Sequence, residues 1–132
     1  MLATRAAPPM ISLCVIAKNE AHCIATMLES VRGLVSEIVV VDTGSTDDTP
    51  AIAAAFGARV ESFEWSDDFA SARNASLSLA TRPWVLVLDA DEELSSESRE
   101  VVSSLITTAP RAYSLERYHF CLRPDAVSSV EV

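Results

Sequence analysis

Two carboxylates one residue apart, Asp89 and Asp91, follow the apolar run WVLVL at residues 84–88. Carboxylates placed in this way at the end of a buried strand can both reach one octahedral Mg²⁺ or Mn²⁺, directly or through water. Such a cation also takes diphosphate oxygens and stabilises the negative charge of a leaving group. The alternative is that the two acids begin a loop and help to cap the following helix. The pair alone favours that structural interpretation, because a D-x-D sequence is common.

Three further side chains are candidates for binding a ligand. Asp42 follows VVV, so its carboxylate either accepts a hydrogen bond from a nucleobase imide N–H or makes an ordinary Asx turn. Glu20 follows the first apolar run of the chain. Arg73, in the segment ASARNAS, either holds a base carbonyl or a phosphate, or pairs with Asp68 or Asp91. Considered one at a time, these residues leave both interpretations open.

Apolar patterning predicts four strands that alternate with helices. Strands that are apolar on both faces are typical of a parallel sheet covered by helices on its two sides. A further strand is expected in the tail, at Tyr113–Cys121. The four main strands are predicted at Ile11–Ala17, Glu37–Val41, Arg59–Trp65 and Trp84–Leu88.

Helices are predicted between these strands from apolar spacing and from signals at their ends. The first runs from Ala21 towards Gly33, and the second follows Ser45 and Asp48, which have the spacing of a capping box. A third helix is expected over Phe69–Ala80, with Asp67 or Asp68 near its start, and a fourth over Ser96–Ile106. The residues expected on the buried faces are Ile24, Met27, Leu28 and Val31, then Ile52, Ala55 and Phe56, then Val101, Val102, Leu105 and Ile106.

The alternating order predicts an α/β fold: an open, mostly parallel sheet with helices on both faces and right-handed crossovers. In such sheets, ligands bind beyond the carboxyl ends of the strands. The loops after the first, second and fourth strands are therefore expected to bring Glu20, Asp42, Asp89 and Asp91 to one end of the sheet. An acidic pocket of this kind suits a hard divalent cation that holds a phosphorylated ligand.

The composition argues against some classes of partner. The formal charge is −9, with 19 acidic residues against 10 basic ones, so nucleic acid is not expected as a partner. No basic run and no apolar run of bilayer length is present, so membrane insertion is not expected. Cys14, Cys23 and Cys121 lack the usual spacing of metal ligands, and residues 1–10 do not resemble a signal peptide. We therefore expect a soluble, cytoplasmic protein.

Four segments together resemble family 2 glycosyltransferases with the GT-A fold, which is Rossmann-like. The segments VIAKNEA, IVVVDTGSTDDT, WSDDFASARNASL and WVLVLDADEEL have the order and spacing of the N-terminal, nucleotide-sugar-binding half of these enzymes. The resemblance covers about residues 11–94. The W-x-D-D-F-A-x-A-R-N form is similar to a bacterial branch that is often joined to tetratricopeptide repeats.

The resemblance implies a role for each candidate residue. Asp42 would read the base, usually uracil, and Glu20 would border the base and ribose. Arg73 would lie near the base or the phosphates. Asp89 would approach the ribose or a metal-bound water, and Asp91 would ligate Mn²⁺ or Mg²⁺.

Two positions depart from the family pattern without removing a metal ligand: Thr43 stands where many members carry Asp, and Ser76 where they often carry Gly. The resemblance also implies a second half that supplies the general base and binds the acceptor. Little chain follows Leu94, so we expect a partial GT-A domain at residues 11–132 after an N-terminal extension at residues 1–10. His119 is a candidate base by its type, although a packing or surface role is the stronger interpretation, and His22 is weaker still.

Two functions are left open. The first is metal-dependent transfer of a sugar from a nucleotide-sugar donor, with a UDP-sugar favoured, to an unknown saccharide, lipid or peptide acceptor. The second is a nucleotide- or metal-binding module without turnover, completed by a partner chain or by the missing half. A response-regulator-like domain is set aside, because it needs a Lys after a late strand and Lys18 is the only Lys. An apolar edge of a truncated sheet would favour a homodimer.

Overall fold

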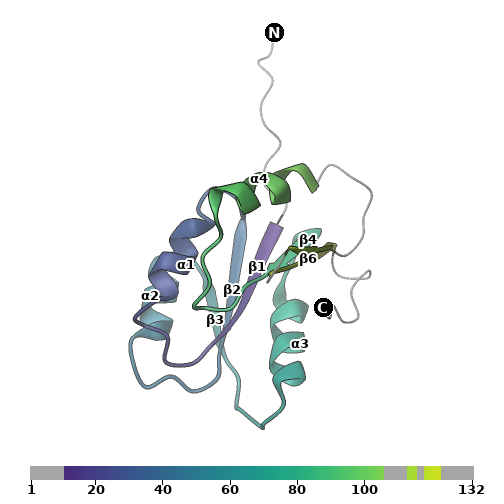
Figure 1. The fold of residues 1–132 in the computed structure, drawn as a ribbon. Coiled ribbons are helices and arrows are strands. Elements are labelled where there is room, and N and C mark those ends of the chain that lie inside the picture. The colour runs from purple at the N-terminus through teal and green to yellow at the C-terminus, as the bar shows by residue number, and fades with distance from the viewer. Residues whose placement is uncertain (1–10, 106–112, 116–117, 123–132) are drawn as a thin grey trace.

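The computed structural model describes residues 11–105, 113–115 and 118–122, with side chains described as far as Ser104. These residues form a six-stranded sheet in the order β3-β2-β1-β4-β6-β5, with helices on both of its faces (Figure 1). The strands are β1 (Ile11–Ala17), β2 (Glu37–Asp42), β3 (Arg59–Ser62), β4 (Trp84–Val87), β5 (Tyr113–Leu115) and β6 (Tyr118–Leu122). The helices are α1 (Ile24–Ser30), α2 (Thr49–Ala55), α3 (Phe69–Leu79) and α4 (Ser96–Leu105).

The strands β3, β2, β1 and β4 are mutually parallel, whereas β6 and β5 pair antiparallel with their neighbours. The expected open, mostly parallel α/β sheet is therefore confirmed. The single strand predicted over Tyr113–Cys121 is wrong, because β5 and β6 are two strands that pair with each other. Only two residues separate them, and a connection that short can join antiparallel strands but not parallel ones.

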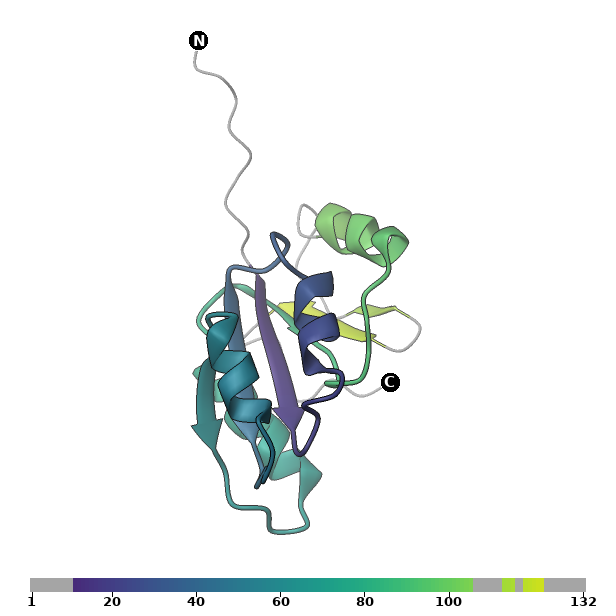
Figure 2. The ribbon, with the colours of Figure 1, turned by 90° about the vertical axis from the view of Figure 1, so that its left-hand side faces the viewer.

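Alternate residues of β1 enter two separate cores, because successive side chains of a strand point to opposite faces. On one face, Leu13 and Val15 pack with residues of α1, α2 and α4. On the other face, Cys14 packs with Val39 and Val85 in the core that α3 covers. Figure 2 shows α1, α2 and α4 on the near side of the sheet and α3 behind it. This two-sided burial explains why the central strands are apolar throughout.

Helix α1 buries the face predicted for it, whereas α2 and α4 each expose a residue that was predicted to be buried. All four apolar residues predicted for the first buried face are buried, although α1 begins at Ile24 rather than Ala21. In α2, Ala55 is exposed, and the buried residues are Thr49 and Ala53 instead. In α4, Val101 is 43% exposed while its neighbour Val102 is fully buried. Of the other predicted residues of the fourth helix, the Leu105 side chain and Ile106 lie outside the described part.

Strand β3 ends at Ser62 rather than at Trp65. Its partner strand β2 ends at Asp42, and Asp42 with Ser62 is the last pair in the register. Beyond this pair the Phe63 N–H still donates to the Asp42 carbonyl at 2.9 Å, after which the chain has no strand to pair with. Trp65 instead meets Phe69 edge-to-face, with ring centroids 5.3 Å apart.

The side of β4 that faces away from β1 is paired with β6, so β4 is not a sheet edge. The homodimer expected from an open apolar edge stays a prediction. Within the described residues, no helix combines the length and the apolar character needed to cross a membrane.

Candidate functional site

The carboxyl ends of β2, β1 and β4 lie side by side, and each leads to a predicted site residue. Glu20 follows β1, Asp42 is the last residue of β2, and Asp89 and Asp91 follow β4. Ala17 pairs with Asp42, so β1 and β2 end level with each other. Because the three strands are parallel, four acidic side chains gather at one end of the sheet.

Hydrogen bonds join the loop after β1 to the loop after β2. The Asn19 N–H donates to Ser45 Oγ at 2.8 Å, and Asn19 Oδ1 accepts from the Thr46 N–H at 2.8 Å. The Glu20 N–H donates to Thr49 Oγ1, also at 2.8 Å. Asn19 has a left-handed φ of 55°, which Asn tolerates better than most residues. The two loops therefore hold Glu20 and Asp42 in a fixed relation.

The capping box predicted from Ser45 and Asp48 is wrong. Helix α2 begins at Thr49, and its N-cap residue Asp48 makes no side-chain cap hydrogen bond. Ser45 is used between the loops instead, and Asp47 accepts from both the N–H and the hydroxyl of Thr49. The Thr49 hydroxyl bond is the main reason that the pKa of Asp47 lies below its usual value.

Asp42 is buried, and within the described ranges only one of its carboxylate oxygens has a hydrogen-bond partner. Oδ2 accepts from the backbone N–H groups of Gly44 at 3.2 Å and Ser45 at 3.0 Å, so Asp42 does make the expected turn. Oδ1 is buried and finds no hydrogen-bond partner among the described residues. A buried acceptor without a partner costs free energy, so a ligand N–H at this position would be stabilising.

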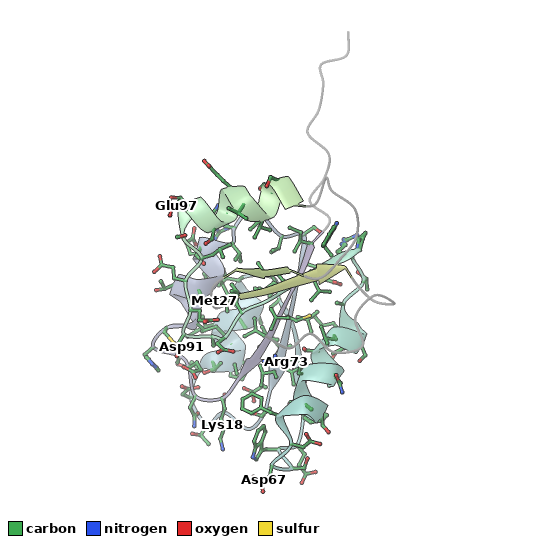
Figure 3. All side chains as sticks on the ribbon, turned by 45° about the vertical axis from the view of Figure 1, so that its right-hand side comes forward. Lys18, Met27, Asp67, Arg73, Asp91 and Glu97 are labelled. Atoms are coloured by element: carbon green, nitrogen blue, oxygen red, sulfur yellow. The ribbon has the colours of Figure 1, made fainter. Side chains whose placement is uncertain are left out.

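Arg73 is half-buried on α3 and makes no ion pair with the described residues. Of the two partners considered for it, Asp68 instead caps α3, accepting from the N–H of Ala70 and from the N–H and hydroxyl of Ser71. The hydroxyl bond, at 2.7 Å, is the largest cause of the lowered pKa of Asp68. Figure 3 shows Arg73 on α3 and Asp91 on the loop after β4. The guanidinium is thus available to a ligand.

Asp89 and Asp91 are exposed in the turn after β4. The Asp89 N–H donates to Glu92 Oε1 at 2.9 Å, and the Glu92 N–H donates to the Asp89 carbonyl at 3.0 Å. Neither aspartate caps α4, because Ser95 Oγ accepts the N–H of Ser98 at the start of that helix. Two exposed carboxylates fit Mg²⁺ or Mn²⁺, which typically takes one or two protein carboxylates together with water and phosphate oxygens.

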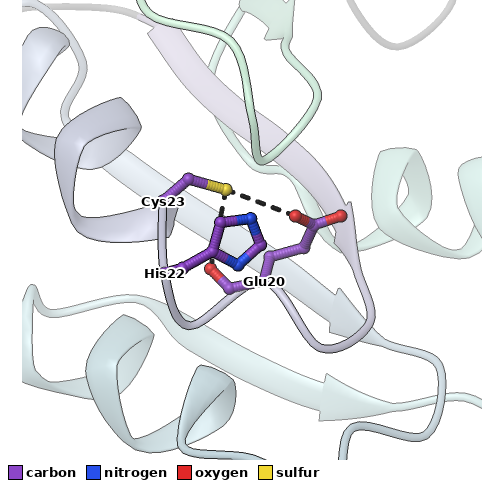
Figure 4. Close-up of side chains that lie close together, drawn as sticks. All are labelled: Glu20, His22 and Cys23. Atoms are coloured by element: carbon purple, nitrogen blue, oxygen red, sulfur yellow. Dashed lines mark hydrogen bonds between the residues drawn. The ribbon is translucent and has the colours of Figure 1, made fainter.

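Glu20, His22 and Cys23 form a group of potential metal ligands that cysteine spacing did not reveal. Their ligand atoms, an oxygen, a nitrogen and a sulfur, lie within 4.8 Å of one another (Figure 4). The Cys23 thiol donates to Glu20 Oε1 at 3.2 Å. Burial, this hydrogen bond and the charges of Glu20 and Asp91 raise the pKa of Cys23 to about 11. The signal in the sequence was E-x-H-C, in which the ligand types are mixed.

Two cavities of about 210 Å³ are lined by residues other than the four acidic side chains of these loops. One is at the amino end of β2, between Arg32, Glu37 and Phe56, and the other lies between α3 and β3. The candidate site is therefore defined by its side chains rather than by these cavities. His119 lies in β6, in register with Val87, and its side chain is outside the described part.

Comparison with known proteins identifies the family. The sequence model of Glycosyl transferase family 2 matches residues 12–122. The chain belongs to glycosyl transferase family 2. Two curated relatives of this family 2 chain are a TPR repeat-containing protein of Synechococcus elongatus and an uncharacterized glycosyltransferase of Rickettsia felis. They are 50% and 41% identical over 70% and 74% of the chain, which spans only 23% and 34% of their own lengths.

Solved structures similar to the family 2 chain share its fold. Glucosyl-3-phosphoglycerate synthase of Mycobacterium tuberculosis, solved with Mn²⁺, UDP and glucosyl-3-phosphoglycerate, is 34% identical with a TM-score of 0.54. The match covers 64% of the chain and 34% of the synthase. S. aureus TarS is 26% identical with a TM-score of 0.65, over 74% of the chain and 32% of the TarS structure. The expected GT-A fold is confirmed by these neighbours.

Proposed function

We propose that the chain binds the donor in a glycosyltransferase that transfers a sugar from a UDP-sugar, with a divalent cation as cofactor. The observation that carries this proposal is Asp42 Oδ1, a buried acceptor at the carboxyl end of β2 that has no partner in the part of the chain that the structure describes. The imide N–H of uracil is a donor of the required kind. UDP is bound in the solved synthase of M. tuberculosis, which supports the choice of nucleotide.

The remaining donor contacts come from residues that the fold leaves available. Glu20 borders the base and ribose, because the hydrogen bond from its N–H to Thr49 holds it beside the β2 loop. Arg73 contacts a base carbonyl or a phosphate, because its guanidinium has no ion pair within the described part. In this arrangement the acidic loops meet the base and ribose, and Arg73 supplies positive charge.

Asp91 holds the divalent cation, and Asp89 approaches the ribose or a water on that cation. Bound there, Mn²⁺ or Mg²⁺ supplies positive charge to the diphosphate leaving group. Structures of the M. tuberculosis synthase contain Mn²⁺ or Mg²⁺ with UDP, which supports a cation of this kind. The acceptor, a saccharide, lipid or peptide, is assigned to none of the described residues, and residues 11–132 stay proposed as a partial GT-A domain.

Thermal unfolding with UDP, GDP and dTDP, each with and without Mn²⁺, tests the proposal. A ligand that binds only the folded state adds about 2.7 kcal/mol of stability at a hundredfold excess over its dissociation constant. We expect the unfolding midpoint to rise with UDP and to rise further with Mn²⁺. No rise with any nucleotide would refute donor binding. Release of UDP from UDP-sugars then separates a glycosyltransferase from a binding module without turnover, which releases none.

A further inference from the structure

We propose that Glu20, His22 and Cys23 form a binding site for a thiophilic divalent cation of the Zn²⁺ class, separate from the Asp89–Asp91 pair. All three residues belong to the turn between β1 and α1. Their carboxylate oxygen, imidazole nitrogen and thiol sulfur lie within 4.8 Å of one another. Figure 4 shows the three side chains gathered on one side of this turn.

The ligand types decide which cation the site takes. Zn²⁺ binds Cys sulfur, His nitrogen and carboxylate oxygen, and three protein ligands leave its fourth tetrahedral position to water. Thiolate sulfur and imidazole nitrogen ligands favour Zn²⁺, whereas Mg²⁺ and Mn²⁺ favour oxygen ligands. The turn and the aspartate pair after β4 therefore differ in the cation that they select.

The separation of the Cys23 and Glu20 ligand atoms is close to that in a zinc centre. Sulfur and oxygen ligands of a tetrahedral Zn²⁺ lie about 3.6 Å apart, given metal–ligand distances of about 2.3 and 2.1 Å. Cys23 Sγ and Glu20 Oε1 are 3.2 Å apart, and the thiol donates its proton in a hydrogen bond to this oxygen. Binding replaces this proton with the cation, and the proton passes to the buffer. The His22 side chain is exposed and makes no hydrogen bond within the described part, so its ring is free to turn onto the cation.

The backbone of the turn is held in place before any ion binds. The Glu20 carbonyl accepts from the N–H of Cys23 at 3.0 Å and of Ile24 at 2.9 Å. The Glu20 N–H donates to Thr49 Oγ1, and the Ala21 N–H donates to Asp47 Oδ2 at 3.1 Å. Fixing the backbone from both sides lowers the entropy cost of bringing three ligands together.

The test measures binding of Zn²⁺ to the full chain without nucleotide, by competition with a chromophoric chelator. Binding of Co²⁺ is followed in parallel by its thiolate charge-transfer absorption. We expect one Zn²⁺ per chain and a Co²⁺ spectrum with the thiolate band. Cys23→Ser and His22→Ala are each expected to weaken Zn²⁺ binding by at least about tenfold, since even the loss of an indirect partner costs about 10- to 100-fold.

The control variants are Cys121→Ser, which removes a thiol elsewhere, and Glu29→Gln, which removes an exposed carboxylate from α1. Both are expected to keep the wild-type affinity, whereas Asp91→Asn, which removes a charge that acts on Cys23, should change it by less than Cys23→Ser does. Far-ultraviolet circular dichroism verifies that each variant is folded. Unchanged affinity in folded Cys23→Ser and His22→Ala would overturn the site. Loss of Zn²⁺ binding in Asp91→Asn but not in Cys23→Ser would assign the cation to the β4 loop and would also overturn it. Because no nucleotide is present, neither result depends on the proposed function.

Discussion

The carboxylate of Glu37, the first residue of β2, accepts two hydrogen bonds from Thr81, which lies 44 residues later and just before β4. The Thr81 N–H donates to Oε1 at 2.7 Å, and the Thr81 hydroxyl donates to Oε2 at 2.9 Å. The hydroxyl of Ser12, in β1, also donates to Oε1, and its oxygen accepts the Arg82 N–H at 3.1 Å. One side chain thus connects the amino ends of three adjacent strands, at the opposite end of the sheet from the candidate site.

Replacing this carboxylate should destabilise the fold. Glu37→Gln keeps the size of the side chain but removes charged acceptors from Ser12 and Thr81, so we expect the free energy of unfolding to fall by about 1 kcal/mol. The matched control Glu29→Gln breaks an exposed ion pair with Arg32 and should cost less stability than Glu37→Gln, because solvent screens exposed pairs. Chemical denaturation measures the free energy of unfolding of both variants. Equal losses in the two variants would contradict a structural role for Glu37.

Glu37 should also make stability depend on pH. Burial alone raises its pKa, but the hydrogen bonds from Ser12 and Thr81, with the charge of Arg82, outweigh burial and lower the pKa below the usual 4.5. A carboxyl group with a lowered folded-state pKa stabilises the protein above its unfolded pKa, and this contribution is lost as the pH falls through the folded value. The difference between the wild type and Glu37→Gln should therefore shrink between about pH 6 and about pH 3. A constant difference in denaturation experiments over that range would be inconsistent with this assignment.

Asp42→Asn should weaken UDP binding with little effect on the fold. The Asn amide oxygen can replace Oδ2 as acceptor for Gly44 and Ser45, which leaves the NH₂ group at the position of Oδ1. A donor then faces the imide N–H of the base, so affinity should fall by at least about tenfold, or about 1.4 kcal/mol. Calorimetry with UDP measures the change. Unchanged affinity would mean that Asp42 does not read the base.

Asp91→Asn should remove the metal dependence of nucleotide binding. In the wild type we expect Mn²⁺ to increase the stabilisation by UDP, and in the variant we expect UDP to stabilise equally with and without Mn²⁺. Asp48→Asn is the control, because Asp48 is an exposed acid whose side chain makes no cap hydrogen bond. If Mn²⁺ still increased the UDP-dependent shift in Asp91→Asn, the cation would have to be held elsewhere.

Cys23 should react slowly with an alkylating reagent at neutral pH. A pKa of about 11 leaves about one thiolate in a thousand at about pH 8, and the thiolate is the reactive form. The rate should rise about tenfold per pH unit up to about pH 10. Glu20→Gln should speed the reaction, because it removes a hydrogen bond and a negative charge that oppose ionisation. Mass spectrometry of the Cys23 peptide measures the rate of alkylation. A rate that levels off below about pH 9 would show that the pKa of Cys23 is not raised.

The sequence by itself determined the central strands and the family. Strands buried on two faces must be apolar throughout, so β1, β2 and β4 were located to within one residue of their observed ends. Four short segments sufficed for the family resemblance. The bounds of a strand were predicted less well where they depend on the strand with which it pairs. Strand β3 ends where its partner β2 ends, and the tail forms two strands, β5 and β6, that pair with each other. The buried positions on α2 and α4 likewise depend on what each helix covers.

Only the tertiary structure decided how the site residues are used. Ser45 has the spacing of a helix cap, yet it binds the Asn19 N–H, 26 residues earlier in the chain. Asp42 makes the turn expected of it, but the lack of a partner for Oδ1 among the residues that the structure describes depends on the side chains around it. The gathering of the Glu20, His22 and Cys23 ligand atoms depends on a turn that contacts from the β2 loop hold in place. Hydrogen bonds between distant loops are set by the way neighbouring strands end together, which local sequence spacing does not encode.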